Sequence, residues 1–414
     1  GPFLSDLFCI ILGLLFILRL TQLKKFSELL YDYKYYIYFF LSYTVYLNFN
    51  SLFSFNPSIS QISSITFFRI FLFIFALGFF LFYHNKIYKN FYIIFFISIF
   101  LLFLDSSIQY FFDLNIFSNK EVHQNRISSL FGEELIMGSY TSRILPIALA
   151  CSFLTEFKNK NLWNIIMLTI SGFLVMFSGE RLAGFYYIGI CVIFFILTKK
   201  HVLKFLTIIV CSTLIIISFK SSVTDRFYKN TISQFNELGS VLSYRHTLHF
   251  KTAYDLFLDN IILGHGIKSF RYKCSEKKYV KSIEEKKIRD LTKINKNSDN
   301  SNKNNQKKYI IEYDNGCNTH PHNIYLEHLA ELGLLGFLFL IIIFFYTSIK
   351  LIKLSLKCLF TGEKNNIYIA RGLILTGIFL QLFPFVPSGS YFNNWMMIIF
   401  HLSIGFYIST LKLR

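Results

Sequence analysis

The sequence predicts an all-α integral membrane protein, and three observations support this fold class. Of its 414 residues, 53% are hydrophobic and 19% are aromatic, including 51 Phe. Apolar runs close to the length of a membrane span recur along the whole chain. Lys and Arg are concentrated in alternate short loops, as they are when basic loops stay in the cytoplasm. A soluble domain of this size does not need so apolar a composition, so we expect one bundle of membrane helices.

Hydropathy predicts about eleven to twelve transmembrane helices. The candidate spans are 3–20, 35–49, 65–83, 91–104, 135–154, 162–177, 182–197, 202–219, 329–349, 367–385 and 392–409. Several are short, which favours tilted helices. We expect one functional unit in three parts: N-terminal transmembrane helices (1–219), a partly helical external loop (220–322) and C-terminal transmembrane helices (323–414). Within the loop, a Lys/Asn-rich stretch at about 275–310 predicts a mobile insert.

The net charge of +18 is distributed as membrane topology requires, not as a nucleic-acid surface. Its alternation between short loops predicts a cytoplasmic C-terminus and places the 220–322 loop outside, in the periplasm if the membrane is a bacterial inner membrane. Long loops cross a membrane largely regardless of charge, so the basic character of this loop does not change the assignment. We therefore expect membrane lipids, and no nucleic acid, as partners.

Two of the seven cysteines, Cys274 and Cys317, fall in the external loop, on either side of the Lys/Asn-rich insert. The periplasm is oxidising, so these two are a candidate disulfide pair. Two alternatives stay open at this stage. Both thiols could be free, or Cys317 could join His320 and His322 in a metal site.

The stretch His320-Pro321-His322-Asn323 passes directly into an apolar helical pattern. Pro321 suits the first turn of a helix, so we expect a helix N-terminus here. The positive end of a helix dipole disfavours a protonated imidazole, and a neutral histidine can act as a general base. His322 is the first candidate and His320 the second, although a histidine at a helix start is often only a cap or a surface residue. The spacing of these histidines does not match the helical zinc motifs, so we expect no metal.

Arginines at the predicted external face are candidate anion-binding residues, because a guanidinium fork can grip a phosphate. Arg181 follows a tight Ser-Gly-Glu turn, and Arg245 opens an amphipathic helix. The other candidates are Arg126, Arg143 and Arg69. Each could instead anchor to lipid headgroups or pair with an acid. Together with a histidine base, these cations suit a substrate with a phosphate or diphosphate and a reacting hydroxyl. No Gly-rich nucleotide loop is present, so we expect an already activated donor and no cofactor.

These motifs, in their order and spacing, resemble the O-antigen ligase and polymerase (Wzy-like) superfamily over about residues 126–394. The residues that carry the resemblance are Ser178-Gly179-Glu180-Arg181, Tyr244-Arg245, Gly264-His265-Gly266, and His320-Pro321-His322-Asn323 followed by Leu332-Gly333-Leu334-Leu335-Gly336. The resemblance departs from the family pattern at His265, which occupies a position usually filled by a small or apolar residue, and in the long insert before Cys317.

The resemblance implies a polytopic glycosyltransferase of the GT-C type that moves a glycan from undecaprenyl diphosphate to an acceptor hydroxyl without a metal. It implies that His322 is the catalytic base, with His320 as the alternative, and that Arg181 and Arg245 bind the diphosphate. Arg126 and Arg143 are weaker candidates for the same role.

Among the possible acceptors we expect lipid A-core sugar, as for an O-antigen ligase, slightly ahead of the next repeat unit, as for a polymerase. A transporter or flippase for an anionic lipid could use the same arginines. It would be expected to show a polar pathway at mid-membrane depth or an internal repeat, and the sequence shows neither.

Overall fold

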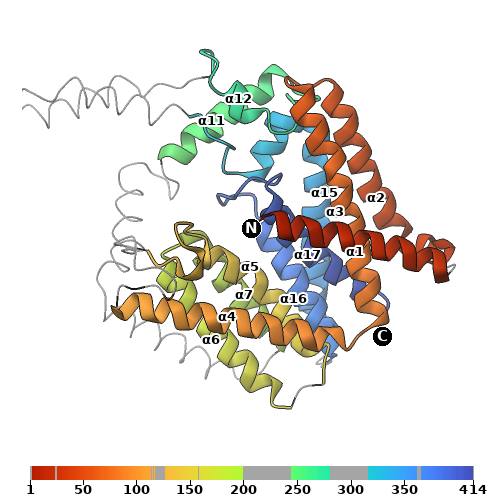
Figure 1. Ribbon diagram of the computed structural model, residues 1–414, viewed down its shortest axis with the longest axis vertical. Helices are drawn as coiled ribbons and strands as arrows, with labels where there is room; N and C mark the ends of the chain where they lie inside the picture. The colour runs from red at the N-terminus through yellow and green to blue at the C-terminus, as the bar shows by residue number, and fades with distance from the viewer. Residues whose placement is uncertain are drawn as a thin grey trace, which may run out of the picture.

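The computed structural model describes residues 2–23, 26–112, 114, 116, 126–156, 158–198, 244–279, 316–360 and 365–413 (Figure 1). Within these ranges the chain is helical and has no β-strand. The helices are α1 Pro2–Leu23, α2 Phe26–Leu52, α3 Pro57–Tyr83, α4 Ile87–Phe112, η1 Ser129–Phe131, α5 Met137–Phe153, α6 Lys160–Ser178, α7 Arg181–Thr198, α11 Tyr244–Asp259, α12 Phe270–Lys273, α15 Ile324–Phe360, α16 Asn366–Gln381 and α17 Asn394–Thr410.

The prediction of an all-α membrane protein is confirmed. In the described part of the chain, six helices are long and apolar enough to cross a membrane, namely α1, α3, α4, α6, α7 and α15. Each expected span coincides with a helix except 202–219, which lies outside the described residues. Some boundaries differ from expectation. Helix α3 begins at Pro57, well before the expected start at 65, because the Asn56 side chain caps it by accepting from the Ile59 N–H at 3.4 Å.

The helices form two groups that meet along α16 (Figure 1). Helix α3 packs along α1, α2 and α17, while α5 packs along α4, α6 and α16. Small residues permit the close contact between α3 and α17. A Cβ added to Gly78 would lie 2.7 Å from the Ile408 side chain, and one added to Gly405 would lie 2.8 Å from Leu77. Close backbone approach at small residues is how membrane helices associate without a hydrophobic driving force.

Helix α15 is broken at Gly333, whose φ of 64° and ψ of −164° are not helical. The break removes intrahelical hydrogen bonds, and the turn that follows α11 replaces them. His265 N–H donates to the Ala330 carbonyl at 3.0 Å, Gly266 N–H donates to the Glu331 carbonyl at 2.7 Å, and Leu334 N–H donates to the Ile261 carbonyl at 2.8 Å. This docking places α11 and α12 over one end of α15 (Figure 1).

The docking depends on two glycines that face each other. A Cβ on Gly264 would lie 2.5 Å from the Gly333 nitrogen, and a Cβ on Gly333 would lie 2.3 Å from the Ile262 carbonyl oxygen. Both have positive φ, +68° and +64°, a region that other residues enter only at a cost. The Gly-His-Gly and Leu-Gly motifs therefore share a structural role, which is to let two backbones touch.

We expect Gly264→Ala to destabilise the protein strongly, because the methyl group overlaps backbone that cannot move aside. The matched control is Gly132→Ala, where φ is also positive, +63°, but nothing lies within 4 Å of the added Cβ. Both variants carry the backbone penalty of about 1–2 kcal/mol, and only Gly264→Ala adds the overlap. Thermal unfolding of the purified proteins in detergent measures the difference. Equal losses of stability in the two variants would show that this contact is not required.

Candidate functional site

The histidine turn, residues 318–322, is set by the cap of α15. Asn323 Oδ1 accepts from the Tyr325 N–H at 3.0 Å and the Leu326 N–H at 3.1 Å, which makes Asn323 the N-cap. The expectation that Pro321 lies in the first helical turn is therefore wrong, because the helix begins at Ile324, after the capping residue. The Asn323 amide also donates to the Pro384 carbonyl at 2.9 Å, so the cap ties the turn to the 382–393 loop.

His322 is held in an unusual backbone conformation. Its φ of +57° lies in the left-handed region, which costs energy for a residue with a Cβ and persists only where neighbours enforce it. The neighbour here is Ser388. Its N–H donates to the His322 carbonyl at 2.8 Å, and its Oγ accepts from the Ile324 N–H at 3.0 Å. Backbone strain of this kind is typical of functional sites.

The ring nitrogens of the two turn histidines lie in different surroundings. The Asn318 amide donates to His322 Nε2 at 3.1 Å on the exposed side of the turn. Since Nε2 accepts this bond, it carries the lone pair and the proton of the neutral ring is on Nδ1. His320 Nδ1 and the Thr319 hydroxyl form a hydrogen bond of 3.0 Å, while His320 Nε2 is buried. His322 Nε2 is thus the basic nitrogen that an incoming hydroxyl can reach by taking the place of Asn318.

Two more histidines from α11 complete a cluster around His322. The ring centroids of His246 and His249 each lie 5.3 Å from that of His322, and the His320 centroid lies 4.2 Å from it. His249 Nδ1 donates to the Gly316 carbonyl at 3.0 Å, which fixes its ring. The sequence placed His246 and His249 beside the polar side of a helix but gave no reason to join them to the turn. The three-residue spacing of His246 and His249, directly after Arg245, is the sequence signal that could have identified them as site residues.

The surroundings of the turn favour the neutral form of His320 and His322. Burial, with the nearby charges of His320, His246 and His249, lowers the pKa of His322 to about 3. Burial, with the charges of Arg271, His249 and His246, lowers the pKa of His320 to about 4. The direction agrees with the expectation of a neutral base, but burial and neighbouring cations are the physical causes.

Arg181 and Arg245 lie at the starts of α7 and α11. Burial is the main reason for the lowered pKa of His246, and the charge of Arg181 also contributes, so Arg181 is close to the cluster. The turn before Arg181 is fixed by Glu180, which accepts from the Gly138 N–H at 3.0 Å and the Ser139 hydroxyl at 2.6 Å. Glu180 therefore supplies an acidic group at the N-terminus of α5.

The other three candidate arginines make structural contacts. Arg69 pairs with Asp6 of α1 at 3.2 Å and bonds to Asn394 of α17 at 3.2 Å. Arg126 donates to the Ser178 carbonyl at 3.0 Å and the Leu135 carbonyl at 2.9 Å. Arg143 is buried, donates to the Ser139 carbonyl at 3.0 Å and lies 5.2 Å from the Tyr186 ring. None of these contacts involves the histidine cluster, so a role in substrate binding for the three stays a prediction.

Residues 166–341 match a protein-family model described as O-antigen ligase. This segment of the chain is similar to the O-antigen ligase family. The matched segment extends from α6 to the middle of α15 and contains the Arg181 turn, the histidine turn and the Gly333 break. No curated protein and no solved structure matches the chain.

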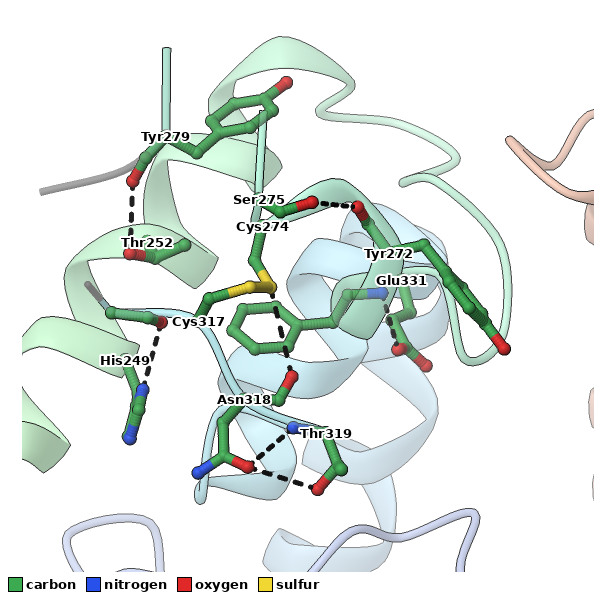
Figure 2. The surroundings of a disulfide bond; sticks show 12 residues. His249, Thr252, Tyr272, Cys274, Ser275, Tyr279, Cys317, Asn318, Thr319 and Glu331 are labelled. Carbon is green, nitrogen blue, oxygen red and sulfur yellow. Dashed lines mark hydrogen bonds between the residues drawn. A yellow bond between two sulfur atoms is a disulfide. The ribbon is translucent and has the colours of Figure 1, made fainter. Parts of the chain in front are cut away.

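Within the segment that matches this family, a disulfide between Cys274 and Cys317 fastens the histidine turn to the segment after α12 (Figure 2). The same view shows His249 bonded to the loop just before Cys317, and Asn318 just after it. A cysteine in a disulfide cannot serve as a thiolate ligand, so Cys317 does not form a metal site with His320 and His322 in this state. Within the described residues, no group of three or more His, Cys, Asp or Glu is arranged to hold a metal ion.

We expect the double variant Cys274→Ser, Cys317→Ser to be less stable and less active than the wild type. The bond closes a loop with a sequence separation of 43 residues, which the chain-entropy model values at about 4 kcal/mol. Peptide mapping without reductant tests the bond, and thermal unfolding tests its contribution. The control is Cys151→Ser, at a free buried cysteine on α5, far along the chain from the turn. Alkylation of both Cys274 and Cys317 in unreduced protein would contradict the assignment.

Proposed function

We propose that this protein is a metal-independent glycosyltransferase of the O-antigen ligase type. It transfers a glycan from undecaprenyl diphosphate to a sugar hydroxyl of lipid A-core at the periplasmic face of a bacterial inner membrane. The observation that carries the proposal is the histidine cluster around His322, built within the segment that matches the O-antigen ligase family, with Arg181 beside it. No cofactor enters the proposal.

The proposed reaction is a single inverting displacement. The acceptor hydroxyl replaces Asn318 at His322 Nε2 and gives its proton to that nitrogen as its oxygen bonds to the anomeric carbon of the donor. The bond from that carbon to the diphosphate oxygen breaks in the same step, and the diphosphate leaves with the electron pair. Arg181 and Arg245 offset its developing charge, as cationic forks do in phosphate sites. The proton and the leaving group are thus both accounted for without a metal.

The arrangement of the loops supports a single catalytic face. The histidine turn contacts the 382–393 loop through Ser388, and the turn after α11 contacts the α2–α3 loop, where Phe55 N–H donates to the His265 carbonyl at 2.8 Å. These loops lie at one end of the bundle, and basic residues such as Lys158, in the α5–α6 loop, and Lys357, in the last turn of α15, belong to the opposite loops and helix ends. By the positive-inside rule, this favours a periplasmic site and a cytoplasmic C-terminus.

In a strain that lacks this protein, we expect lipid A-core without long glycan chains, and undecaprenyl-linked polymer that accumulates. His322→Ala should fail to restore the chains, because loss of a general base typically costs about a hundred- to ten-thousandfold in rate. His320→Ala should restore them in part. The measurement is the gel profile of lipopolysaccharide, with membrane insertion checked by immunoblot.

Two outcomes would change the proposal. Lipid A-core capped by a single repeat unit means that the protein is a polymerase, because ligation then still occurs. Normal chains with His322→Ala and none with His320→Ala would exchange the roles of the two histidines.

The histidine pKa values predict a particular pH dependence. The base must be neutral, so the rate falls as pH falls through its pKa. In the free enzyme the pKa of His322 is about 3, whereas a bound diphosphate adds negative charge nearby and raises the pKa. Since kcat/KM reports the free enzyme and kcat reports the substrate complex, the acidic limb of kcat should lie at higher pH than that of kcat/KM. Initial rates of purified protein between about pH 4 and 8, roughly the range of histidine titration, should show the acidic limb of kcat, while kcat/KM stays level down to the acidic end of the range. Coincident limbs near pH 6.5, about the value of an unperturbed histidine, would contradict this account.

A further inference from the structure

The short helix α12 and the turn before it carry two cations that the proposed mechanism does not use. Arg271 is exposed and Lys268 is half-buried. Within the part of the chain that the structure describes, neither head group makes a hydrogen bond or an ion pair within 4.0 Å. Lys268 also has a positive φ of +62°, which is uncommon for a residue other than Gly, Asn or Asp. Strained backbone and unpaired cations together make this turn a candidate binding element.

Three ties hold this turn rigidly beside the histidine turn. Glu331 of α15 accepts from the Lys268 N–H at 2.7 Å and from the Phe270 N–H at 3.1 Å. The disulfide joins Cys274, at the end of α12, to Cys317. Figure 2 shows the disulfide, with Asn318 and Thr319 of the histidine turn below it. A side chain mounted in this way can hold an anion with little loss of conformational entropy.

The two groups of cations belong to different elements, Arg181 to α7 and Arg271 to α12. Arg181 acts electrostatically on His246, whereas Arg271 acts on His320. Arg271 and Lys268 also act on each other, so they lie close together. A transferase binds two substrates, and the hydroxyl of one must meet the anomeric carbon of the other at the base. One cationic group therefore suits the donor diphosphate, and the second lies where the acceptor must approach.

A purely structural role for Arg271 is the simpler alternative, because the buried carboxylates of Glu327 and Glu331 lie within its electrostatic reach. Those carboxylates are already hydrogen-bonded, however. Glu331 accepts the two N–H groups named above, and Glu327 accepts from the Tyr391 N–H at 2.7 Å and from the Ser390 hydroxyl. A charged partner on an exposed side chain is not needed to satisfy them.

We infer that Arg271 and Lys268 form a second anion-binding subsite that receives an anionic group, a phosphate or a carboxylate, on the acceptor glycolipid near the accepting hydroxyl. The inference rests on the proposed transfer reaction and adds the charge of the acceptor to it. The Arg271 guanidinium supplies a bidentate fork, and the Lys268 ammonium supplies a second charge from a partly desolvated position.

The test is steady-state transfer by the purified protein in detergent, with Arg271→Gln compared with wild type. Each is assayed on three acceptors: native lipid A-core, the same acceptor after phosphatase treatment, and the same acceptor after reduction of its carboxylates. A lost hydrogen bond to a charged group corresponds to about a 10- to 100-fold weaker interaction. We therefore expect the acceptor KM of Arg271→Gln to rise by about that factor on native acceptor, with the donor KM unchanged. Whichever treatment removes the difference between variant and wild type identifies the anionic group.

The controls separate this inference from the proposed function. Lys277→Gln removes an exposed cation from the same segment and should leave the acceptor KM unchanged. Arg271→Lys keeps the charge but not the fork, and should lie between wild type and Arg271→Gln. Arg181→Lys should raise the donor KM and not the acceptor KM.

An unchanged acceptor KM in Arg271→Gln, with Arg181→Lys still impaired, overturns the subsite and leaves the transfer reaction intact. A raised donor KM in Arg271→Gln also overturns it, because Arg271 would then belong to the donor site. If Arg271→Gln does not fold and Arg271→Lys has normal kinetics, Arg271 has a structural role and the subsite is overturned. If the wild type transfers to none of the three acceptors, the proposed function itself fails.

Discussion

The break in α15 is the constraint on which the rest of the external architecture depends. A membrane helix cannot leave backbone N–H and C=O groups unpaired where water is absent, so an interruption survives only if other groups satisfy them. Here the turn after α11 does so, and the Tyr46 hydroxyl donates to the Leu332 carbonyl. That turn can approach closely enough only because Gly264 meets Gly333 without a Cβ on either side. The helix break and the external elements therefore depend on each other, and a change at either glycine reaches the histidine turn.

Two carboxylates on the first turns of α15 extend this arrangement to the remaining loops. Glu327 and Glu331 are one helical turn apart and buried, with 2% and 1% of their surfaces exposed. Burying an acid is costly unless hydrogen bonds offset the loss of water. Glu327 accepts from the backbone of Tyr391, and Glu331 from the backbone of Lys268 and Phe270. The N-terminal end of α15 thus holds the loops that pack beside His322. These bonds explain how the strained histidine turn keeps its geometry.

Most of the fold could be predicted from the sequence, because long apolar runs in a membrane protein have almost no alternative to helices. The histidine turn could also be located. The break at Gly333 could not be predicted, because the hydropathy of the surrounding run is continuous. Only the docking of a distant turn stabilises the break. Arg69 was grouped with the site arginines because its partner, Asp6, is 63 residues away in sequence. His249 was not grouped with the site because ring contacts across α11 and the turn arise only after α11 docks. Local patterns predict elements well, whereas long-range pairing decides which polar residues meet.

In the proposed reaction, the electrostatics of the site couple the base to the leaving group. Burial and the neighbouring histidines make an imidazolium at His322 unfavourable, as its lowered pKa, about 3, indicates. A proton transferred to His322 before the donor bond breaks would therefore place a positive charge where nothing stabilises it. The departing diphosphate supplies the opposite charge within the same step. A pocket that disfavours the charged base on its own thus couples proton transfer to departure of the leaving group, and it discourages the base from acting on water when no donor is bound.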